Sequence, residues 1–356
     1  MKINLITYSF LGPTHAYQFG TSRTLVGGLE IYTYDLAKYL QTLGHEVTIS
    51  QAWCENKDFQ LEDGIKVRGI RPFLCQKRSY FFNFCVKEAI ENKAEINHLM
   101  FYLNAFPFAH RHMTGTCHGL MWDDPRMPFY KREALVFLND FAVKRLKAIA
   151  TCDTSLLKYV QLKFPTLRDK IHLVPNYVKT EIFNPNIRLP ETYRTLYDKT
   201  RVILVPRNLS VGKGCDLALL AFRLLAKKYS NIVLVYVGDG PLRSWIQMNA
   251  KKYGLEHSVF LEGHKNHFRE MAYYYTLADI VLIPSYASEG MSLACLEAQA
   301  CAKPVVVTNI GGLTDTIIGG FNGIVVKPNP KAIARGIELL LEDRKLRAKL
   351  VSNGLV

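Results

Sequence analysis

The chain has 356 residues, of which 49% are hydrophobic and 21% charged, and its formal net charge is +14. This length exceeds the usual size of a single hydrophobic core, so the composition predicts a globular protein with two domains. No apolar run approaches the roughly 18 residues that a membrane helix needs, and residues 2–7 are too short and polar for a signal peptide. We therefore expect a cytoplasmic protein.

The positive charge is spread over the whole sequence and forms no tail or block. A diffuse positive field attracts nucleotide sugars, acidic lipid headgroups and nucleic acids alike, so charge alone does not choose among them. The eight cysteines include no C-x2-C pair, and most lie in apolar contexts. We expect them to be reduced and buried.

Short apolar runs alternate with amphipathic stretches of ten or more residues along the chain. This alternation is typical of parallel strands joined by crossover helices and predicts two doubly wound α/β sheets. The expected strands are 3–7, 47–51, 96–101, 115–117, 149–152, 171–174, 202–205, 232–237, 259–261, 280–283 and 305–307. The proline-bearing segment 175–190 is the expected linker, which gives domains at 1–178 and 179–356.

Two segments of the first half have an unusual length or composition. Residues 8–26 form a longer connection than is usual between a strand and a helix, and they predict either a lid or acceptor loop or a segment without fixed structure. Residues 77–87 interleave aromatic with basic side chains, which is compatible with docking on an acidic lipid surface. A buried crossover helix is the favoured interpretation of that second segment.

Several polar and glycine residues follow the carboxyl ends of predicted strands. They are Arg207, Gly238, Gly263, Glu289 and Gly311. Ligands of open α/β sheets bind in the crevice at the carboxyl ends of the strands. We therefore expect a binding site at this edge of the second sheet, at the interdomain cleft if that edge faces the first domain.

The segment from Glu289 to Glu297 suits a sugar nucleotide. An apolar strand at 279–284 leads through a short loop into a helix expected at 291–302. Four backbone N–H groups stand free near the helix start, those of Gly290, Met291, Ser292 and Leu293. With the positive end of the helix dipole they predict a diphosphate site, and Glu297 lies roughly 10 Å further along the axis. Two acceptor groups flanking an anion site match the sugar and the ribose of a nucleoside diphosphate sugar.

These motifs resemble those of the retaining glycosyltransferases of family 4. The segment 289–297 resembles the E-x7-E motif of that family, 205–222 its Arg and Lys-Gly elements, and 237–241 its glycine turn. Further similar segments follow in the same order, at 27–30, 44–47, 118–122, 174–176, 261–264 and 304–312. The resemblance spans nearly the whole chain. It implies the GT-B fold, with a Rossmann-like acceptor domain and a Rossmann-like donor domain, each a doubly wound parallel sheet, facing across a cleft.

Arg207 and Lys213 are expected to stabilise the charge on the departing diphosphate. The chain contains no Asp-x-Asp pair to hold a divalent metal, so we expect a metal-independent reaction without a cofactor. By the resemblance, Glu289 contacts hydroxyls of the transferred sugar and Glu297 holds the ribose hydroxyls. The competing interpretations are a surface pair of cations at a strand end and a glutamate on a helix surface.

His118 is similar to the family histidine that faces the sugar from the first domain, and a structural histidine with satisfied hydrogen bonds is the alternative. His110 and His112 precede it in an H-x-H-x5-H pattern, but zinc is not expected because no fourth ligand is evident.

Glycines and one further histidine complete the predicted donor site. Gly27 and Gly28 lie where the first loop meets its helix and allow close backbone approach to the diphosphate or the acceptor, although a simple turn there competes. Gly238 belongs to the glycine turn. The backbone around Gly263 and His264 is expected to recognise the nucleotide base.

The sequence thus predicts transfer of a hexose from a nucleoside diphosphate sugar to a hydroxyl of a glycan or lipid-linked acceptor, by the resemblance with retention of configuration. Peripheral contact with a membrane is compatible with this function. A nucleic acid glucosyltransferase agrees with the charge, but no aromatic and basic stripe suited to base stacking is evident. A catalytically idle sugar-nucleotide-binding subunit is the third hypothesis, and the intact cations and glutamates argue against it. Many relatives continue past the position of Val356 into a helix that crosses to the first domain, so we expect domain closure to be weaker or braced differently here.

Overall fold

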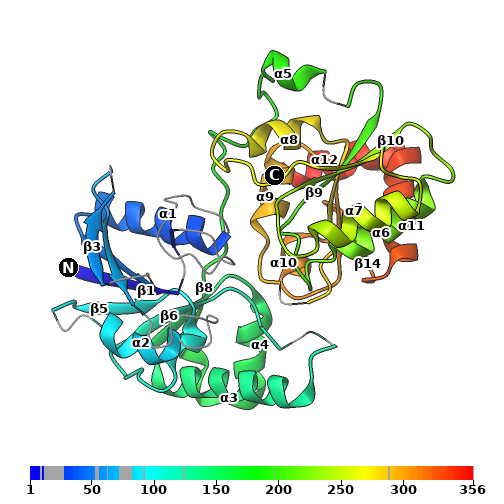
Figure 1. The fold of residues 1–356 in the computed structure, drawn as a ribbon. Helices are drawn as coiled ribbons and strands as arrows, with labels where there is room; N and C mark the ends of the chain where they lie inside the picture. Colours follow the sequence, from blue (N-terminus) through cyan, green and yellow to red (C-terminus); the bar gives the residue numbers. More distant parts are fainter. Residues whose placement is uncertain are drawn as a thin grey trace. The chain divides into compact units, whose positions relative to one another are not determined.

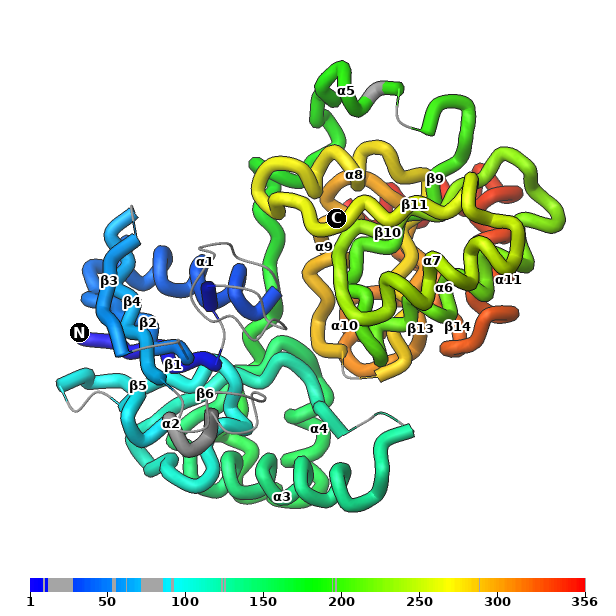
Figure 2. The backbone as a smooth tube through the Cα atoms, in the orientation of Figure 1, coloured from blue at the N-terminus to red at the C-terminus, as the bar shows by residue number. Residues whose placement is uncertain are grey.

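The computed structural model describes residues 1–8, 10–11, 28–52, 56–61, 63–71, 82–90, 93–122, 124, 126–195, 197–287 and 289–355. Two compact units divide the chain, one made of Met1–Trp122 and Arg126–Pro175 and the other mainly of Asn176–Val356 (Figures 1 and 2). None of the described helices combines the length and the apolar character that a membrane crossing requires.

The first unit contains an eight-stranded sheet in the order β3-β4-β2-β1-β5-β6-β7-β8. Its strands are β1 (Lys2–Thr7), β2 (Glu46–Ala52), β3 (Lys57–Gln60), β4 (Lys66–Ile70), β5 (Ile96–Leu99), β6 (Thr114–Cys117), β7 (Ala148–Thr151) and β8 (Ile171–Leu173). Its helices are α1 (Gly28–Thr42), α2 (Phe82–Ala89), α3 (Phe129–Arg145) and α4 (Thr154–Lys163), with 3-10 turns η2 (Tyr102–Ala105) and η3 (Pro165–Lys170). Helix α1 covers one face of the sheet, and α2, α3 and α4 cover the other (Figure 1).

The second unit contains a six-stranded parallel sheet in the order β11-β10-β9-β12-β13-β14. Its strands are β9 (Arg201–Pro206), β10 (Ile232–Val237), β11 (Val259–Leu261), β12 (Ile280–Ile283), β13 (Val305–Thr308) and β14 (Ile324–Val326). Its helices are α5 (Glu191–Arg194), α6 (Cys215–Leu225), α7 (Arg243–Lys252), α8 (Met271–Leu277), α9 (Leu293–Ala300), α10 (Leu313–Thr316), α11 (Pro330–Glu342) and α12 (Arg344–Gly354). Strands β10 and β11 follow β9 on one side of the sheet, and β13 and β14 follow β12 on the other. The order of the strands therefore reverses between the neighbours β9 and β12.

Strand β10 illustrates why the second sheet forms. All six of its residues are buried and apolar, as expected for a parallel strand covered on both faces. Leu234 and Tyr236 enter the core beneath α6, α7 and α11, whereas Val233 and Val235 enter the core beneath α8, α9 and α10. The period of two residues thus divides the apolar side chains between two cores.

The structure confirms two doubly wound α/β sheets and departs from the sequence predictions in detail. Strands β3, β4 and β14 were not predicted, and β3 pairs with β4 in the antiparallel direction. The helix expected at 291–302 is shorter, because Ser292 is already its extended N-cap residue. The connection 8–26, apart from Tyr8, Phe10 and Leu11, lies outside the described residues. Of the segment 77–87 only the part in α2 is described, and there Val86 is buried while Lys87 is exposed.

Candidate functional site

The reversal between β9 and β12 brings two loops together at the carboxyl edge of the second sheet. Arg207 follows β9 directly, and Lys213 lies in the same loop before α6. Ser285 and Glu289 lie between β12 and α9. A point where the strand order reverses opens a crevice between diverging loops, and ligands of such sheets bind there. This edge therefore holds the candidate site.

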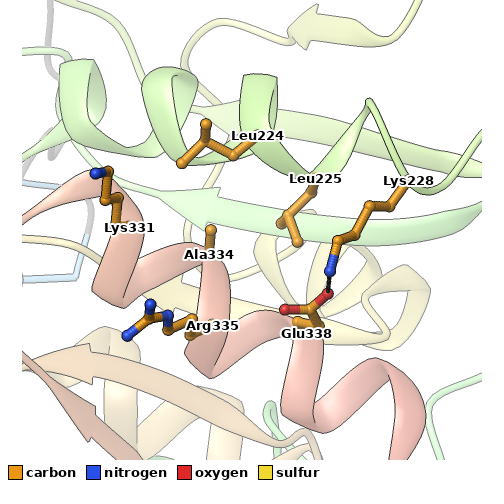
Figure 3. A pocket seen from close by; sticks show the side chains of 7 residues that line it. All are labelled: Leu224, Leu225, Lys228, Lys331, Ala334, Arg335 and Glu338. Atoms are coloured by element: carbon orange, nitrogen blue, oxygen red, sulfur yellow. Dashed lines mark hydrogen bonds and ion pairs between the residues drawn. The ribbon is translucent and has the colours of Figure 1, made fainter.

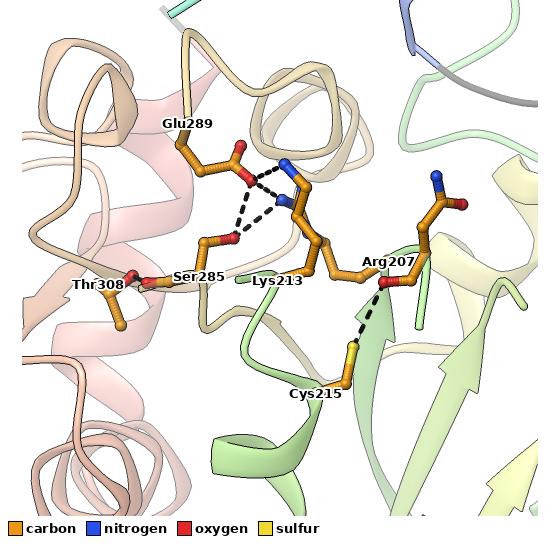
Figure 4. A network of polar contacts seen from close by, with 7 residues as sticks. Arg207, Lys213, Cys215, Ser285, Glu289 and Thr308 are labelled. Carbon is orange, nitrogen blue, oxygen red and sulfur yellow. Dashed lines mark hydrogen bonds and ion pairs between the residues drawn. The ribbon is translucent and has the colours of Figure 1, made fainter. Parts of the chain in front are cut away.

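One carboxylate oxygen accepts hydrogen bonds from two cationic side chains at this position (Figure 4). Oε1 of Glu289 is bound by the Arg207 guanidinium, and Nζ of Lys213 donates to it at 2.6 Å. Ser285 lies between them, because its Oγ donates to Glu289 at 2.9 Å and accepts from Nη2 of Arg207 at 2.9 Å. Glu289 is only 5% exposed. The cluster therefore carries one positive charge beyond what the carboxylate neutralises.

The Arg207 guanidinium has unused capacity to bind an anion. Its Nε is buried and, among the described residues, has no hydrogen-bond partner. Burial lowers the pKa of Arg207, yet a guanidinium stays protonated throughout the range in which proteins work. A buried charged donor without a partner is costly unless a ligand satisfies it. The geometry thus provides a directed donor for an oxyanion beside Glu289.

Backbone contacts hold the two loops in place. The Thr308 hydroxyl, at the end of β13, donates to the carbonyl oxygen of Ser285. The N–H of Gly312 donates to the carbonyl of Glu289 at 3.0 Å. Asn176 donates through Nδ2 to the carbonyl of Met291 at 2.7 Å. Hydrogen bonds from distant segments, two of them from side chains, thereby fix the backbone on either side of the carboxylate.

Two glycines permit close packing of these loops. Gly214 has a φ of 71°, and a Cβ there would come within 1.9 Å of the Pro284 carbonyl oxygen. Gly238 has a φ of 137°, and its Cβ would lie 2.2 Å from the Arg207 carbonyl oxygen. Positive φ combined with backbone contact excludes any other residue without local rearrangement. Gly238 therefore packs closely against the backbone of Arg207.

The remaining predicted donor residues lie at the same sheet edge or beside it. The N–H of Gly238 donates to the carbonyl of Gly263 at 2.8 Å, and His264 is exposed. Four backbone N–H groups before or at the start of α9 make no hydrogen bond to the described part of the chain: those of Gly290, Met291, Ser292 and Leu293. Free N–H groups beside the positive end of a helix are suited to an anion.

Glu297 is buried in α9, so it is not a glutamate of the helix surface. It is 5% exposed, and its Oε2 accepts from the Tyr275 hydroxyl at 2.6 Å. Nε2 of His267 lies 3.5 Å from its Oε1. Burial raises the pKa of Glu297 and lowers the pKa of His267, so desolvation favours the neutral form of each.

The predicted residues of the first unit form a separate group. His118 follows β6, and its Nε2 lies 3.0 Å from the Met100 carbonyl oxygen, which can only accept, so Nε2 carries the proton and Nδ1 keeps its lone pair. The Tyr32 ring packs edge-on against it at 5.0 Å. Gly28 begins α1, and Gly27 lies outside the described residues. His110 and His112 approach each other, but in the described part of the chain no three metal-ligating side chains form a cluster.

The site includes residues that the sequence did not single out. Ser285 follows β12 in the same way as Arg207 follows β9, so its position at a strand end was the available signal. Tyr275 in α8, His267 in the preceding loop and Thr308 in β13 gave no local signal, because only the folded chain brings them to the glutamates.

A titration experiment tests the buried histidines of the first unit. Burial lowers the pKa of His118 to about 4, and the same holds for His98, whose ring nitrogens both contact threonine hydroxyls at 2.8 Å. Since the folded pKa lies below the unfolded value of about 6.5, the folded unit gains stability as pH rises through this window and loses it as pH falls from about 6.5 towards 4. The expected loss is roughly 3 kcal/mol for each histidine.

Proton NMR of the ten histidines provides the measurement. The two signals that disappear in the variants His98→Asn and His118→Asn should not titrate above pH 5. A midpoint near pH 6.5 for either ring would contradict its burial as a neutral group.

A pocket remote from this edge serves as a reference point. It has a volume of about 160 Å³ and lies between α6 and α11, where Leu224, Leu225 and Ala334 line it with Arg335 and the ion pair of Lys228 and Glu338 (Figure 3). None of the predicted site residues contributes to it. Its exposed Arg335 therefore offers a matched control for substitutions at Arg207.

Comparisons with known proteins identify the family of the chain. Residues 193–355 match the family model of the glycosyl transferases group 1, and residues 26–182 match that of glycosyltransferase family 4. An uncharacterised glycosyltransferase of Methanocaldococcus jannaschii is 27% identical, over 99% of this chain and 92% of the relative.

Solved structures show the same fold. Sucrose-phosphate synthase of Thermosynechococcus elongatus is similar with a TM-score of 0.79 and 19% identity, over 99% of this chain and 93% of that one. Anabaena HepE, solved in complex with UDP and glucose, has a TM-score of 0.75 and 18% identity, over 100% of this chain and 94% of that one. From the two family matches and the fold, we conclude that the chain belongs to the group 1 glycosyltransferases and has their GT-B fold.

Proposed function

We propose that the protein transfers a sugar from a nucleoside diphosphate sugar to a hydroxyl of a glycan or lipid-linked acceptor, without a metal ion and with retention of configuration. In this proposal the second unit binds the donor and the first unit binds the acceptor. The observation that carries it is the pair Arg207 and Lys213 on one buried carboxylate, beside four backbone N–H groups that make no hydrogen bond to the described residues.

The diphosphate of the donor would take the place of Glu289 as the partner of both cations. It has the charge and the oxygen geometry that a guanidinium and an ammonium bind together. The released carboxylate of Glu289 then accepts from hydroxyls of the sugar. Glu297, held by Tyr275 and His267, lies on the same helix and accepts from the ribose hydroxyls.

The reaction breaks the bond between the anomeric carbon and the diphosphate oxygen and forms a bond from that carbon to the acceptor oxygen. The acceptor proton moves to the departing phosphate, and the nucleoside diphosphate leaves. Arg207, Lys213 and the N–H groups of 290–293 stabilise the charge that develops on the leaving oxygen, which is the largest single contribution in such transfers. His118 is neutral at physiological pH and keeps the lone pair of Nδ1, so this atom can accept a hydrogen bond.

Thermal unfolding with UDP, GDP, ADP and dTDP sugars tests the proposal. A ligand at 100 times its dissociation constant should stabilise the protein by about 2.7 kcal/mol. One donor class should stabilise the wild type and the variant Arg335→Ala but not Arg207→Ala, and that donor should be consumed in the presence of a metal chelator. Binding of no donor, or equal binding by all three proteins, would exclude a diphosphate site at Arg207.

A further inference from the structure

Helix α3 presents aromatic side chains to solvent. Phe129 is 76% exposed, Tyr130 69% and Phe137 55%. Helical spacing of four, seven and eleven residues aligns Tyr130 with Ala134, Phe137 and Phe141 on one stripe. The opposite side of the helix buries its residues against the core of the first unit, as Val143 does. A surface helix usually turns a polar face to water, so apolar residues on both sides of α3 need an explanation.

The exposed stripe belongs to a larger cluster. The Phe106 ring packs edge-on against Phe137 and Phe141, with centroids 5.5 and 5.2 Å apart. We name Phe106, Tyr130, Phe137 and Phe141 the α3 aromatic face. Rings that contact one another hold a fixed shape, and this face therefore meets a partner without first ordering its side chains.

Cations border the α3 aromatic face. Lys131, Lys144 and Arg145 are exposed on the same helix, and the Arg145 guanidinium lies 5.7 Å from the centre of the Phe141 ring. Of the two acids of this helix, Glu133 is exposed, whereas Asp140 is bound by Lys163 at 2.8 Å. The border of the aromatic face is therefore net positive.

We propose that the α3 aromatic face docks on the surface of an anionic lipid bilayer, with α3 lying in the plane of the interface. Aromatic rings are favoured at the level of the lipid headgroups, and the bordering lysine and arginine side chains reach anionic phosphates. A second copy of the chain fits less well, because an isologous contact would bring two net positive borders together. This inference does not depend on the donor chemistry of the second unit.

Sedimentation with vesicles tests the inference on the whole chain in the absence of any sugar nucleotide. The wild type should bind vesicles of phosphatidylcholine with phosphatidylglycerol, and bind phosphatidylcholine alone more weakly. The double variant Tyr130→Ser/Phe137→Ser should bind about tenfold less tightly or worse. In the variant Lys144→Gln/Arg145→Gln the affinity for anionic vesicles should fall about fivefold for each cation removed, and the affinity should depend less on salt concentration.

Met248→Ser is the matched control, because Met248 is 64% exposed on α7 of the second unit. Its binding to vesicles should equal that of the wild type. The proposal would be overturned if Tyr130→Ser/Phe137→Ser bound vesicles as tightly as the wild type. It would also be overturned if size-exclusion chromatography showed a dimer that is lost only in this double variant. Thermal stabilisation of each variant by the donor shows that the variant is folded. If the donor does not stabilise the wild type either, the proposed function is contradicted and the docking proposal is not affected.

Discussion

Arg207→Lys is expected to lower kcat by about a hundredfold or more, although the positive charge is kept. An ammonium is a point charge, and it cannot reproduce a planar guanidinium whose Nη2 contacts both Ser285 and Glu289 while its Nε, which has no partner among the described residues, can donate to an oxyanion. Removing one preorganised donor from a developing oxyanion costs about 100- to 1,000-fold in kcat. Steady-state kinetics of sugar transfer with the donor identified by thermal stabilisation gives the measurement.

The control is Arg335→Lys, the same substitution at the exposed position between α6 and α11, which should leave kcat unchanged. The lysine variant at 207 should still pair with Glu289 and unfold at nearly the wild-type temperature. If its kcat falls less than about threefold, Arg207 does not contact the reacting diphosphate, because loss of a charged hydrogen bond in a transition state costs far more.

Gly214→Ala is expected to destabilise the second unit by about 4 kcal/mol or more, close to the upper end of single substitutions. A positive φ costs a residue with a Cβ about 1 to 2 kcal/mol. The added Cβ would also lie 1.9 Å from the Pro284 carbonyl oxygen, so that the loops after β9 and β12 must separate. Urea unfolding of the purified variant measures the change.

Gly254→Ala separates the two causes. Its φ of 68° is close to the 71° of Gly214, but no atom lies within 4 Å of the position of its Cβ. This control should lose only about 1 to 2 kcal/mol, the cost of the backbone conformation alone. Equal losses in the two variants would show that the loops tolerate the added methyl group and that close packing at Gly214 is not required.

The continuous apolar strands of the second sheet could be predicted from the sequence because parallel strands covered on both faces are apolar throughout, as in 232–237. Strands β3 and β14, each at one edge of its sheet, could not, although the opposite edge strands β8 and β11 were predicted at 171–174 and 259–261. Strand β3 reads Lys-Asp-Phe-Gln and is largely exposed, and β14 has three half-buried residues. Such strands form because a neighbouring strand offers hydrogen bonds, and this partner is not visible in a local pattern.

The candidate site was predictable where a residue follows the carboxyl end of a buried strand, as Arg207 does directly and Glu289 does in the loop after β12. The direct ion pair between these two residues was not predicted, because the sequence assigned the cation and the carboxylate to different parts of a ligand. The same limit holds for Glu297. Its burial beneath Tyr275 and His267 depends on α8 and the loop before it, and the spacing of an isolated helix contains no information about them.

The paired state of Glu289 has a consequence for the proposed reaction cycle. A carboxylate tethered beside both cations is an internal competitor, present at a fixed effective concentration whatever the donor concentration. A monophosphate, with less charge to offer, should displace it poorly, so the site favours diphosphates. The same competition weakens the hold on the spent nucleotide, since Glu289 can return to Arg207 and Lys213 as soon as the sugar has gone. The competition by Glu289 therefore lowers the affinity for the donor and speeds the release of the product.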